Sequence, residues 1–512
     1  MRDHGPAEVE SRSELIHELL DEAAAQVPDR RAVTDSDGSW TYRELNSYSH
    51  AFATWLLSQG VGRGDRIVLQ LPTSRRMAAM FYGASRVGAV FVPLNPAMKG
   101  YHLNQVVPDA RPKVVITDTE GVARFADSTP APVFELDRVW AELGLFLAPD
   151  GSAAWSESTP VCGADILTLI YTSGSTAAPK GVICPQAQVT FATWALTEAL
   201  GYRADDVVFC RFPMSWDYGL YKVVMACAAR CEIVVADGES DLVLLERMRE
   251  TGATIVPIVP SLAAMIIQLC ARDSSRLPPV RMFTNTGAAL PQTTSDALRE
   301  YFPDVRVVRQ YGQTEAKRIT VMPPEQDRER PGSSGLPLPR TQVLILDDDG
   351  HPLPAGQVGE IVAVGPHVMP GYWHQPELTA TTFRPDPGTG GLRLHTGDYG
   401  SLDEDGYLYF QGRRDDMFKS KGFRMSTLEI EAATMDIPGV RAAAALPPSE
   451  EHELALFVEA DLTARQIIKE LRQRLEPAKV PAFCQVLGEF PLTLNGKSAR
   501  DELAALRERA TR

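Results

Sequence analysis

The sequence predicts an α/β protein in which parallel sheets covered by helices are followed by a β-rich region and a small C-terminal domain. Three observations lead to this prediction. Short apolar segments alternate with helix-length segments along residues 1–120, and the pattern recurs up to residue 312, which is typical of βαβ units. Residues 332–410 are rich in Gly, Pro and short strand-like runs. The remaining chain carries strand and helix patterns of its own, so we expect a domain boundary at residue 414.

Local patterns predict the individual elements. A helix over residues 41–60 begins with a capping box, because Thr41 is followed three positions later by Glu44. Strands are predicted where a short apolar run lies between turn residues. These runs are residues 65–72, 89–95, 113–117, 231–237, 254–260 and 305–312. In the last region, residues 455–460 predict a strand and residues 464–475 predict a helix.

Composition and charge argue against several classes of protein. The 512 residues carry a net charge of −15, whereas nucleic acids and anionic membranes attract basic surfaces. No apolar run is long enough to cross a bilayer, and the polar start MRDHGPAEVE does not resemble a signal peptide. The seven cysteines are scattered, and only Cys227 and Cys231 lie close together in sequence. We therefore expect reduced, mostly buried thiols and a cytoplasmic protein without nucleic-acid or membrane partners.

Residues 171–182, YTSGSTAAPKGV, form the strongest chemical motif. An apolar strand over residues 166–171 runs into a loop of Gly and hydroxyl side chains that ends at Lys180. Backbone N–H groups, hydroxyls and one ammonium in such a loop can surround a polyphosphate. The loop is not a Walker A motif, because Pro179 precedes the lysine and Gly181 follows it. The alternative is a flexible surface loop, which Ser, Gly and Thr also favour.

Residues 212–222, FPMSWDYGLYK, place Asp217 between two aromatic residues in an otherwise apolar stretch. A carboxylate is rarely buried without a partner, because its desolvation is costly. We therefore expect Asp217 to face a cation, and we hypothesise that this cation belongs to a substrate. The alternative is that Asp217 caps the N-terminus of a helix over residues 218–229, since Asp is a favoured cap.

Further motifs follow along the chain. They are residues 311–316 (YGQTEA), 359–383 (GEIVAVGPHVMPGYWHQPELTATTF), 395–398 (HTGD), 412–425 (GRRDDMFKSKGFRM) and 491–503 (PLTLNGKSARDEL). Together with the phosphate loop, they resemble the ordered core motifs of the acyl- and aminoacyl-adenylating superfamily. That superfamily contains acyl-CoA synthetases, adenylation domains of nonribosomal peptide synthetases and luciferases. The resemblance implies a large N-terminal domain (residues 1–414) of two α/β subdomains plus a β-rich subdomain. It also implies a small mobile α+β C-terminal domain (residues 415–512) that turns at a hinge, Asp415.

The resemblance further implies ATP and Mg²⁺, and it assigns roles to single residues. Glu315 would hold Mg²⁺, and Lys497 of the mobile domain would stabilise the transition state, with Thr172 as a third catalytic residue. Asp398 and Arg413 would bind the ribose, and the Tyr311 ring would face adenine. The full set expected at the nucleotide is Thr172, Ser173, Gly174, Ser175, Thr176, Lys180, Gly287, Ala288, Tyr311, Gly312, Thr314, Asp398, Arg413 and Lys497.

Each of these residues also has an ordinary interpretation. Taken singly, Glu315 fits a helix start, Tyr311 fits a core aromatic residue, and Lys497 fits a solvated charge. One position departs from the family pattern, because Ala177 stands where the phosphate loop usually carries Gly. We expect this change to leave activity intact.

The substrate prediction rests on Asp217, which falls where amino-acid-adenylating members carry the aspartate that holds the substrate amine. The segments DYGLYK and RQYGQTEA resemble the stand-alone β-amino-acid adenylating enzymes that load starter units onto carrier proteins in macrolactam polyketide pathways. Leu220 would shorten the pocket, so a short aliphatic substrate such as 3-aminobutyrate is expected. The predicted pocket residues are Trp216, Asp217, Leu220, Ser261, Thr286, Gly312 and Arg318. An inward-pointing Arg318 would instead suit a β-amino dicarboxylate such as 3-methylaspartate, although arginine is more commonly exposed.

The expected acceptor is the phosphopantetheine thiol of an acyl carrier protein acting in trans, because the chain after Lys497 carries no attachment segment. Coenzyme A is the other candidate thiol. Carrier proteins are typically acidic, and residues 472–479 (RQRLEPAK) offer a basic cluster. Three other functions remain open: an AMP-forming acyl-CoA ligase, a luciferase-like oxygenase, and a degenerate nucleotide-binding subunit. The presence of Glu315, Asp398, Arg413 and Lys497 argues against the last of these.

Overall fold

The structure is a computed structural model, and it confirms the predicted α/β class. It describes residues 13–98, 100–126, 128–148, 160–172, 179–236, 238–273, 275–287, 289–413, 417–420, 423–449, 452–475, 479–492 and 498–511. Several predicted residues lie outside these ranges, as does the predicted domain boundary at 414–415. They are Ser173, Gly174, Ser175, Thr176, Ala288, Asp415 and Lys497.

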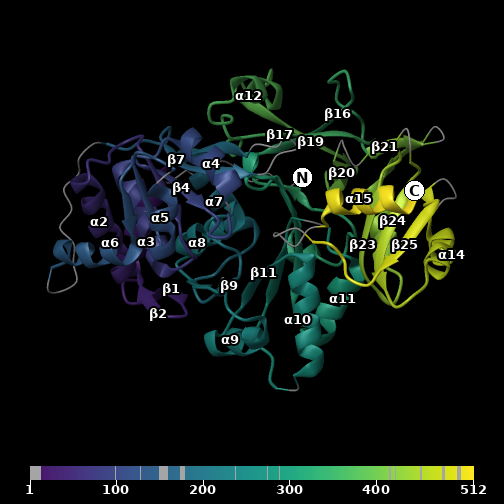
Figure 1. Ribbon diagram of the computed structural model, residues 1–512, viewed down its shortest axis with the longest axis horizontal. Helices are drawn as coiled ribbons and strands as arrows, with labels where there is room; N and C mark the ends of the chain where they lie inside the picture. The colour runs from purple at the N-terminus through teal and green to yellow at the C-terminus, as the bar shows by residue number, and fades with distance from the viewer. Residues whose placement is uncertain are drawn as a thin grey trace.

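A six-stranded sheet lies at one end of the molecule (Figure 1). Its order is β6-β5-β3-β4-β7-β8, and only the β7–β8 pair is antiparallel. The strands are β3 (Arg66–Gln70), β4 (Val90–Leu94), β5 (Val114–Thr117), β6 (Val133–Glu135), β7 (Ile166–Thr172) and β8 (Lys180–Pro185). The helices of this region are α1 (Ile16–Gln26), α2 (Tyr42–Ser58), α3 (Arg75–Val87), α4 (Gly100–Ala110), α5 (Thr119–Ala126) and α6 (Leu136–Leu143). β4 and β5 are buried along their length, as expected for parallel strands between helices.

A nine-stranded sheet follows in the order β15-β14-β13-β12-β11-β9-β10-β1-β2. The strands are β1 (Arg31–Asp35), β2 (Gly38–Thr41), β9 (Val207–Cys210), β10 (Glu232–Val235), β11 (Ile255–Ile258), β12 (Met282–Asn285), β13 (Arg306–Tyr311), β14 (Thr320–Val321) and β15 (Leu336–Pro337). Its helices are α7 (Gln186–Ala199), α8 (Asp217–Ala229), α9 (Leu244–Thr251), α10 (Pro260–Arg272) and α11 (Gln292–Tyr301). The strands from β1 to β13 in this order pair in parallel.

The predicted β-rich region is a five-stranded antiparallel sheet. It contains β16 (Gln342–Leu346), β17 (Gly359–Val364), β18 (Phe383–Pro385), β19 (Leu392–Leu402) and β20 (Leu408–Arg413), with helix α12 (Pro376–Thr382). Two strands after it form a separate hairpin, β21 (Met417–Ser420) and β22 (Phe423–Ser426).

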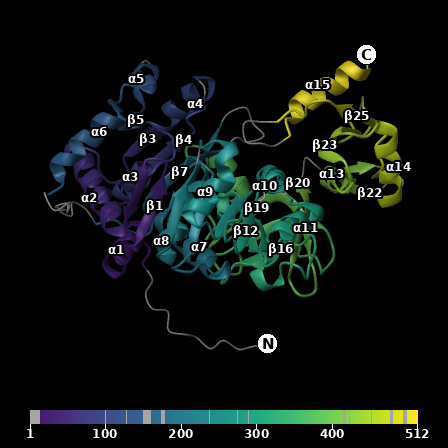
Figure 2. The ribbon, with the colours of Figure 1, turned by 90° about the horizontal axis from the view of Figure 1, so that it is seen from below.

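The C-terminal elements gather beside β20 as a unit of their own (Figure 2). They are α13 (Thr427–Met435), β23 (Val440–Leu446), β24 (Ala455–Ala460), α14 (Ala464–Arg474), β25 (Phe483–Leu487) and α15 (Arg500–Thr511). Their buried apolar side chains form two clusters, and every described member of these clusters lies between Ile430 and Leu506. A core of its own is what an independent domain requires.

The local predictions are confirmed. Each of the six apolar runs contains a strand, namely β3, β4, β5, β10, β11 and β13. Thr41 caps α2, and both hydrogen bonds of its capping box with Glu44 are present. All seven cysteines are free, and five of them are buried. Within the described ranges, no helix is both long and apolar enough to cross a membrane.

Candidate active site

The predicted substrate residues lie at the ends of neighbouring parallel strands. The chain leaves β9, β11, β12 and β13 at their carboxyl ends and continues into the segments that hold Asp217, Ser261, Thr286 and Gly312. Because the carboxyl ends of parallel strands meet at one edge of a sheet, four distant segments are brought together there. This edge is where open α/β sheets bind their ligands.

Asp217 forms an ion pair with Lys317, a residue that sequence reasoning missed. The Lys317 Nζ atom donates a hydrogen bond to Asp217 Oδ1, and the two side chains are only 2% and 11% exposed. Burial alone would lower the pKa of Lys317, but the Asp217 carboxylate outweighs it, so this pKa lies above the usual value. Lys317 Nζ also lies 3.3 Å from Cys184 Sγ.

The alternative that Asp217 is a helix cap is wrong. The N-cap of α8 is Trp216, without a side-chain cap hydrogen bond, and Asp217 is the first residue of the helix. In the first helical turn a carboxylate is favoured by the helix dipole. The partner of Asp217 is therefore a cation, as its burial predicted, but in this structure the cation belongs to the protein.

The backbone around Lys317 is held in an uncommon conformation. Lys317 has φ +56° and ψ −76°, in a region that side chains with a Cβ rarely occupy. Gly312 packs directly against this turn, because a Cβ on Gly312 would lie 2.6 Å from Arg318 Cα and 2.7 Å from the Lys317 carbonyl oxygen. The glycine of the YGQTEA motif therefore allows the Lys317–Arg318 turn to close.

Arg318 is buried, which favours the alternative that the sequence left open for this residue over the more common exposed arginine. The residue is only 7% exposed, and its Nε donates to Gln310 Oε1 at 3.2 Å. Its guanidinium carbon lies 4.7 Å from the centre of the Tyr218 ring. Among the ion pairs of the described residues, none involves Arg318. The consecutive residues Lys317 and Arg318 thus contact the consecutive residues Asp217 and Tyr218, the first pair through an ion pair and the second through a cation–π contact.

A second polar cluster joins Lys180, Glu315 and Tyr372. Lys180 Nζ lies 3.2 Å from Glu315 Oε1 and donates to the Tyr372 hydroxyl at 2.9 Å. That hydroxyl donates to the same carboxylate oxygen at 2.7 Å. Tyr372 was missed as a site residue, although it belongs to the quoted GPHVMPGYW segment. The same segment also contacts Glu315 through its backbone, because the Met369 N–H donates to the Glu315 carbonyl at 2.9 Å.

Thr172 stands beside this cluster at the end of β7, where it pairs with Lys180 across the β7–β8 hairpin. Its Oγ1 atom is buried and has no hydrogen-bond partner among the described residues. A carboxylate and an unused hydroxyl are oxygen ligands of the kind that Mg²⁺ prefers. Glu315 and Thr172 therefore fit a magnesium ion, and Lys180 fits a phosphate group.

The predicted ribose residues are also close together. Asp398 on β19 and Arg413 on β20 are cross-strand neighbours, with Arg413 Nε 3.5 Å from Asp398 Oδ1. The Tyr311 hydroxyl donates to Asp398 Oδ2 at 2.8 Å. The Tyr311 ring stacks on Phe410 with 5.4 Å between ring centres, so Phe410 supports the aromatic face that was predicted for adenine.

The remaining predicted residues differ in exposure. Leu220 and Thr286 are buried, Trp216 and Thr314 are half-buried, and Ser261 and Gly287 are exposed. Leu220 lies within the main hydrophobic core, one turn along α8 from Asp217. An exposed Ser261 is the least suited of this set to contact a buried substrate.

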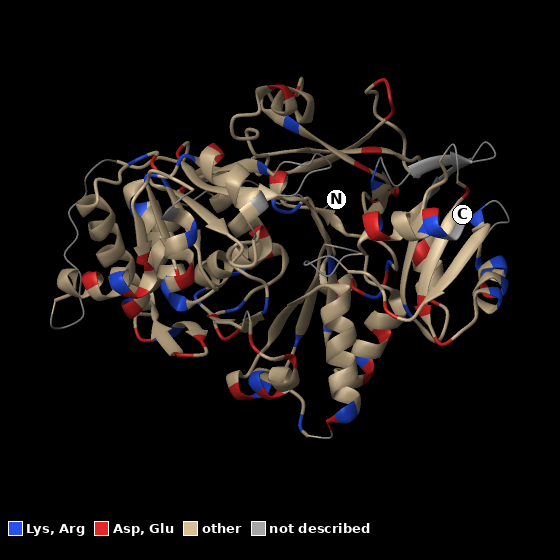
Figure 3. Ribbon diagram, viewed as in Figure 1, with Lys and Arg blue, Asp and Glu red and all other residues tan. Residues whose placement is uncertain are grey.

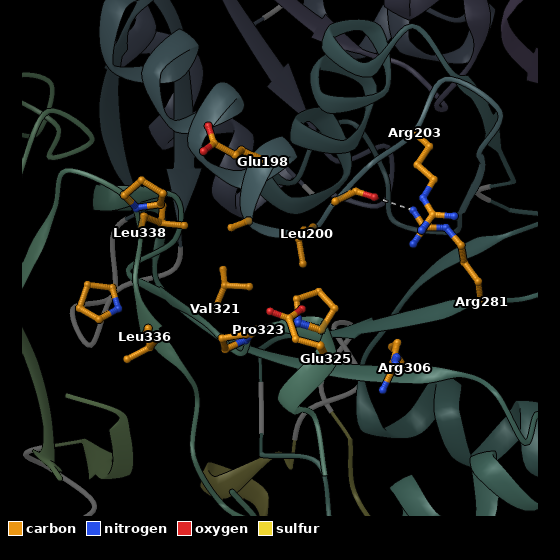
Figure 4. Close-up of a pocket in the computed structure, with 15 residues that line it drawn as sticks. Glu198, Leu200, Arg203, Arg281, Arg306, Val321, Pro323, Glu325, Leu336 and Leu338 are labelled. Carbon is orange, nitrogen blue, oxygen red and sulfur yellow. Dashed lines mark hydrogen bonds between the residues drawn. The ribbon is translucent and has the colours of Figure 1, made fainter. Parts of the chain in front are cut away.

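A cavity of about 590 Å³ lies away from these residues (Figure 4). It is lined by the end of α7, by Val321, by residues 323–325 and by residues 336–339, together with three arginines. Two of these arginines, Arg281 and Arg306, stand at the amino ends of β12 and β13. The cavity is therefore at the opposite edge of the sheet, and none of the predicted site residues lines it.

The chain belongs to the AMP-binding enzyme family. Residues 20–373 match the AMP-binding enzyme domain, and residues 429–497 match the AMP-binding enzyme C-terminal domain. These matches agree with the adenylating superfamily that the ordered motifs resembled.

Among solved structures, VinN is 51% identical, with a TM-score of 0.73 over 78% of this chain and 98% of that chain. VinN is also known in complexes with L-aspartate and with 3-methylaspartate, which align at 50% and 47% identity. ATP-bound MatB from Rhodopseudomonas palustris is 25% identical, with a TM-score of 0.84 over 97% of this chain and 99% of that chain. VinN thus shares far more sequence with this chain, and MatB shares the fold over more of its length.

Curated relatives include much longer proteins. CymA of Salinispora arenicola, a nonribosomal peptide synthetase by name, is 33% identical over 504 residues, which are 96% of this chain and 6% of that protein. A dimodular nonribosomal peptide synthase of Bacillus subtilis is 28% identical over 502 residues, 21% of its length. The chain spans only this small part of these relatives.

Proposed function

We propose that this enzyme adenylates a β-amino dicarboxylic acid related to aspartate or 3-methylaspartate, and then transfers it to the phosphopantetheine thiol of an acyl carrier protein. The observation that carries this proposal is the set Asp217, Lys317 and Arg318, in which two buried cations accompany one largely buried carboxylate. The likeness to VinN, which binds L-aspartate and 3-methylaspartate, supports it.

Charge balance favours a dicarboxylate over 3-aminobutyrate. Asp217, Lys317 and Arg318 together leave one positive charge in excess. The ammonium of 3-aminobutyrate would add a second, whereas the ammonium and second carboxylate of an amino dicarboxylate cancel each other. Buried charges are costly unless paired. The prediction of a short aliphatic substrate rested on Leu220, and an inward-pointing Arg318 was the argument for a dicarboxylate. The burial of Arg318 therefore favours the dicarboxylate.

Binding would then exchange ion pairs. The substrate ammonium replaces the Lys317 ammonium on Asp217, and the second carboxylate receives Lys317 and Arg318. Arginine binds a carboxylate with two parallel hydrogen bonds, which also fixes the orientation of the substrate. The reacting carboxylate is thereby directed toward the cluster around Lys180 and Glu315.

The first chemical step joins the free carboxylate to AMP. A carboxylate oxygen attacks the α-phosphorus of ATP, and the bond to the pyrophosphate oxygen breaks. Lys180 and the proposed Lys497 neutralise developing negative charge, and Asp398 with Arg413 holds the ribose. A magnesium ion, held by Glu315 and Thr172, would neutralise phosphate charge when bound. In the second step the thiol sulfur attacks the acyl carbon, the proton of the thiol is released, and AMP leaves.

The second step needs a different arrangement of residues 415–512, which we propose turn about Asp415 as a mobile domain. Helix α14 carries several Lys and Arg residues (Figure 3), and we propose that an acidic carrier protein docks on it. Arg465, Lys469 and Arg472 are exposed on this helix, within a chain of net charge −15. Replacing these three residues by Glu should slow loading of the carrier protein and leave pyrophosphate exchange unchanged. Lys113→Glu, an exposed charge on the N-terminal part, is the matched control.

The substrate proposal is tested by carboxylate-dependent exchange of labelled pyrophosphate into ATP. The panel is L-aspartate, 3-methylaspartate, 3-aminobutyrate, succinate and butyrate. We expect the two amino dicarboxylates to react at least about 10²-fold faster than acids that lack the amino group or the second carboxylate, because each missing group leaves a charge of the protein unpaired. Equal rates for 3-aminobutyrate and aspartate would reject the second-carboxylate site. Equal rates for butyrate and 3-aminobutyrate would reject Asp217 as the amine site.

The same assay tests the pocket wall. Leu220→Gly should admit β-amino acids with longer chains, since Leu220 lies one turn from Asp217 on α8. If the variant shows the same preference among β-amino acids of different chain length, Leu220 packs in the core and does not line the substrate pocket.

A further inference from the structure

Lys222 is a buried lysine without a carboxylate partner among the ion pairs of the described residues. It lies on α8 and is 1% exposed. Its Nζ atom lies 3.4 Å from the Tyr202 hydroxyl and 3.9 Å from Met225 Sδ. These contacts are poor compensation for burying an ammonium, so a role beyond packing is indicated.

Lys222 shares an aromatic ring with Arg318. The centre of the Tyr218 ring lies 4.9 Å from Lys222 Nζ and 4.7 Å from the guanidinium carbon of Arg318. The Tyr218 hydroxyl donates to the Thr284 carbonyl at 2.9 Å, which fixes the ring in place. The ring attracts each cation, but the charge of Arg318 acts against a protonated Lys222, since both side chains are buried.

The charge of Lys222 is therefore sensitive to what Arg318 binds. Burial first, and the charge of Arg318 second, lower the pKa of Lys222 to about 7. The groups that face it from other elements are the Tyr202 phenol, the Cys210 thiol on β9 and Arg318 itself. Burial raises the pKa values of Tyr202 and of Tyr218, so both phenols stay neutral near pH 7.

We propose that Lys222 is a positioning residue that acts through Tyr218 and Arg318, and that it takes up a proton from solvent when the second carboxylate of the substrate pairs with Arg318. This inference rests on the proposed function. An anion on Arg318 cancels the charge that repels the Lys222 ammonium, so the protonated form becomes favoured. By linkage, the same coupling makes substrate binding stronger as the pH falls toward 7.

Proton uptake distinguishes this role from a structural one. Calorimetric titration of the full-length enzyme with L-aspartate, in buffers of different ionisation enthalpy at pH 7.5–8.5, should show uptake of a fraction of one proton. The same titration with 3-aminobutyrate should show less uptake, because that acid places no anion on Arg318. The KM for aspartate should rise with pH in this window by at most about tenfold per pH unit, the limit for one proton.

Variants make the assignment specific to Lys222. Lys222→Met keeps the length and removes the charge, and it should abolish the extra uptake and flatten the pH dependence of KM for aspartate. Tyr218→Phe keeps the ring between the two cations and should retain both effects. The proposal is overturned if wild-type enzyme binds aspartate without this extra uptake, or if Lys222→Met retains it. Failure of aspartate to bind wild-type enzyme would instead reject the proposed function.

Discussion

Lys317 donates a hydrogen bond to Asp217, a residue 100 positions earlier in the chain. The site that was predicted to receive a substrate ammonium already contains an ammonium of the protein. A ligand that displaces Lys317 must supply a cation for Asp217 and an anion for Lys317. This requirement selects for ligands that carry both charges, because each single charge would leave a buried group unpaired.

Removing one partner of this ion pair should destabilise the protein more than removing both. Asp217→Asn leaves the Lys317 ammonium buried without its counter-ion, with an expected loss of about 3–5 kcal/mol in unfolding free energy. The double variant Asp217→Asn with Lys317→Met contains neither charge and should recover most of this loss. Urea unfolding of the wild type, of the single variants Asp217→Asn and Lys317→Met, and of the double variant measures the coupling between the two charges. Simple additivity of the two single losses would contradict a direct pair.

Arg318→Met should change the substrate preference. The variant loses a charge-assisted contact, so kcat/KM for aspartate should fall about 10–10²-fold. The value for 3-aminobutyrate should stay level or rise, because one buried excess charge is gone. Pyrophosphate exchange measures both, with Arg203→Met, an exposed arginine, as the control. A parallel loss for the two acids would place Arg318 outside the substrate site.

Lys497→Ala should lower the adenylation rate about 10²–10³-fold, the effect of losing one charged transition-state donor. Thermal unfolding should show an unchanged melting temperature, since the lysine is predicted to act in catalysis and to pack little. Single-turnover formation of the adenylate measures the rate. Wild-type rates in this variant would remove Lys497 from the first step.

His367 should make the protein less stable in mild acid. The residue is fully buried, and neither ring nitrogen has a hydrogen-bond partner among the described residues. Burial lowers its pKa from 6.5 to about 4. Between about pH 6.5 and pH 4, this histidine is therefore protonated in the unfolded chain but neutral in the folded protein. The free energy of unfolding accordingly falls as the pH is lowered across this window.

The size of this effect is limited by the pKa difference, to at most about 3.4 kcal/mol. His367→Leu should flatten the decline of melting temperature between pH 6.5 and pH 4. An identical decline in the variant would assign the acid sensitivity to other groups, such as His17, whose pKa burial also lowers to about 4.

The elements could be predicted because their causes are local. Thr41 and Glu44 are three residues apart, so their capping box follows from sequence spacing alone. The apolar runs that form β3, β4 and β5 could be recognised from their own side chains, because burying apolar side chains away from water is favourable. The order of the motifs likewise indicated the family, and the matched domains confirm it.

The sequence by itself determined that Asp217 is an isolated acidic residue in an apolar stretch, which favours a cation as its partner because a buried carboxylate is costly when unpaired. Only the tertiary structure decided that Lys317 is this cation and that Arg318 points inward. The same holds for Tyr372, whose hydroxyl reaches Glu315 across 57 residues. Such pairs depend on which strand ends meet at the edge of the sheet. The spacing of residues along the chain does not show which strand ends meet, because the pairing of strands far apart in sequence is set by the packing of the whole domain.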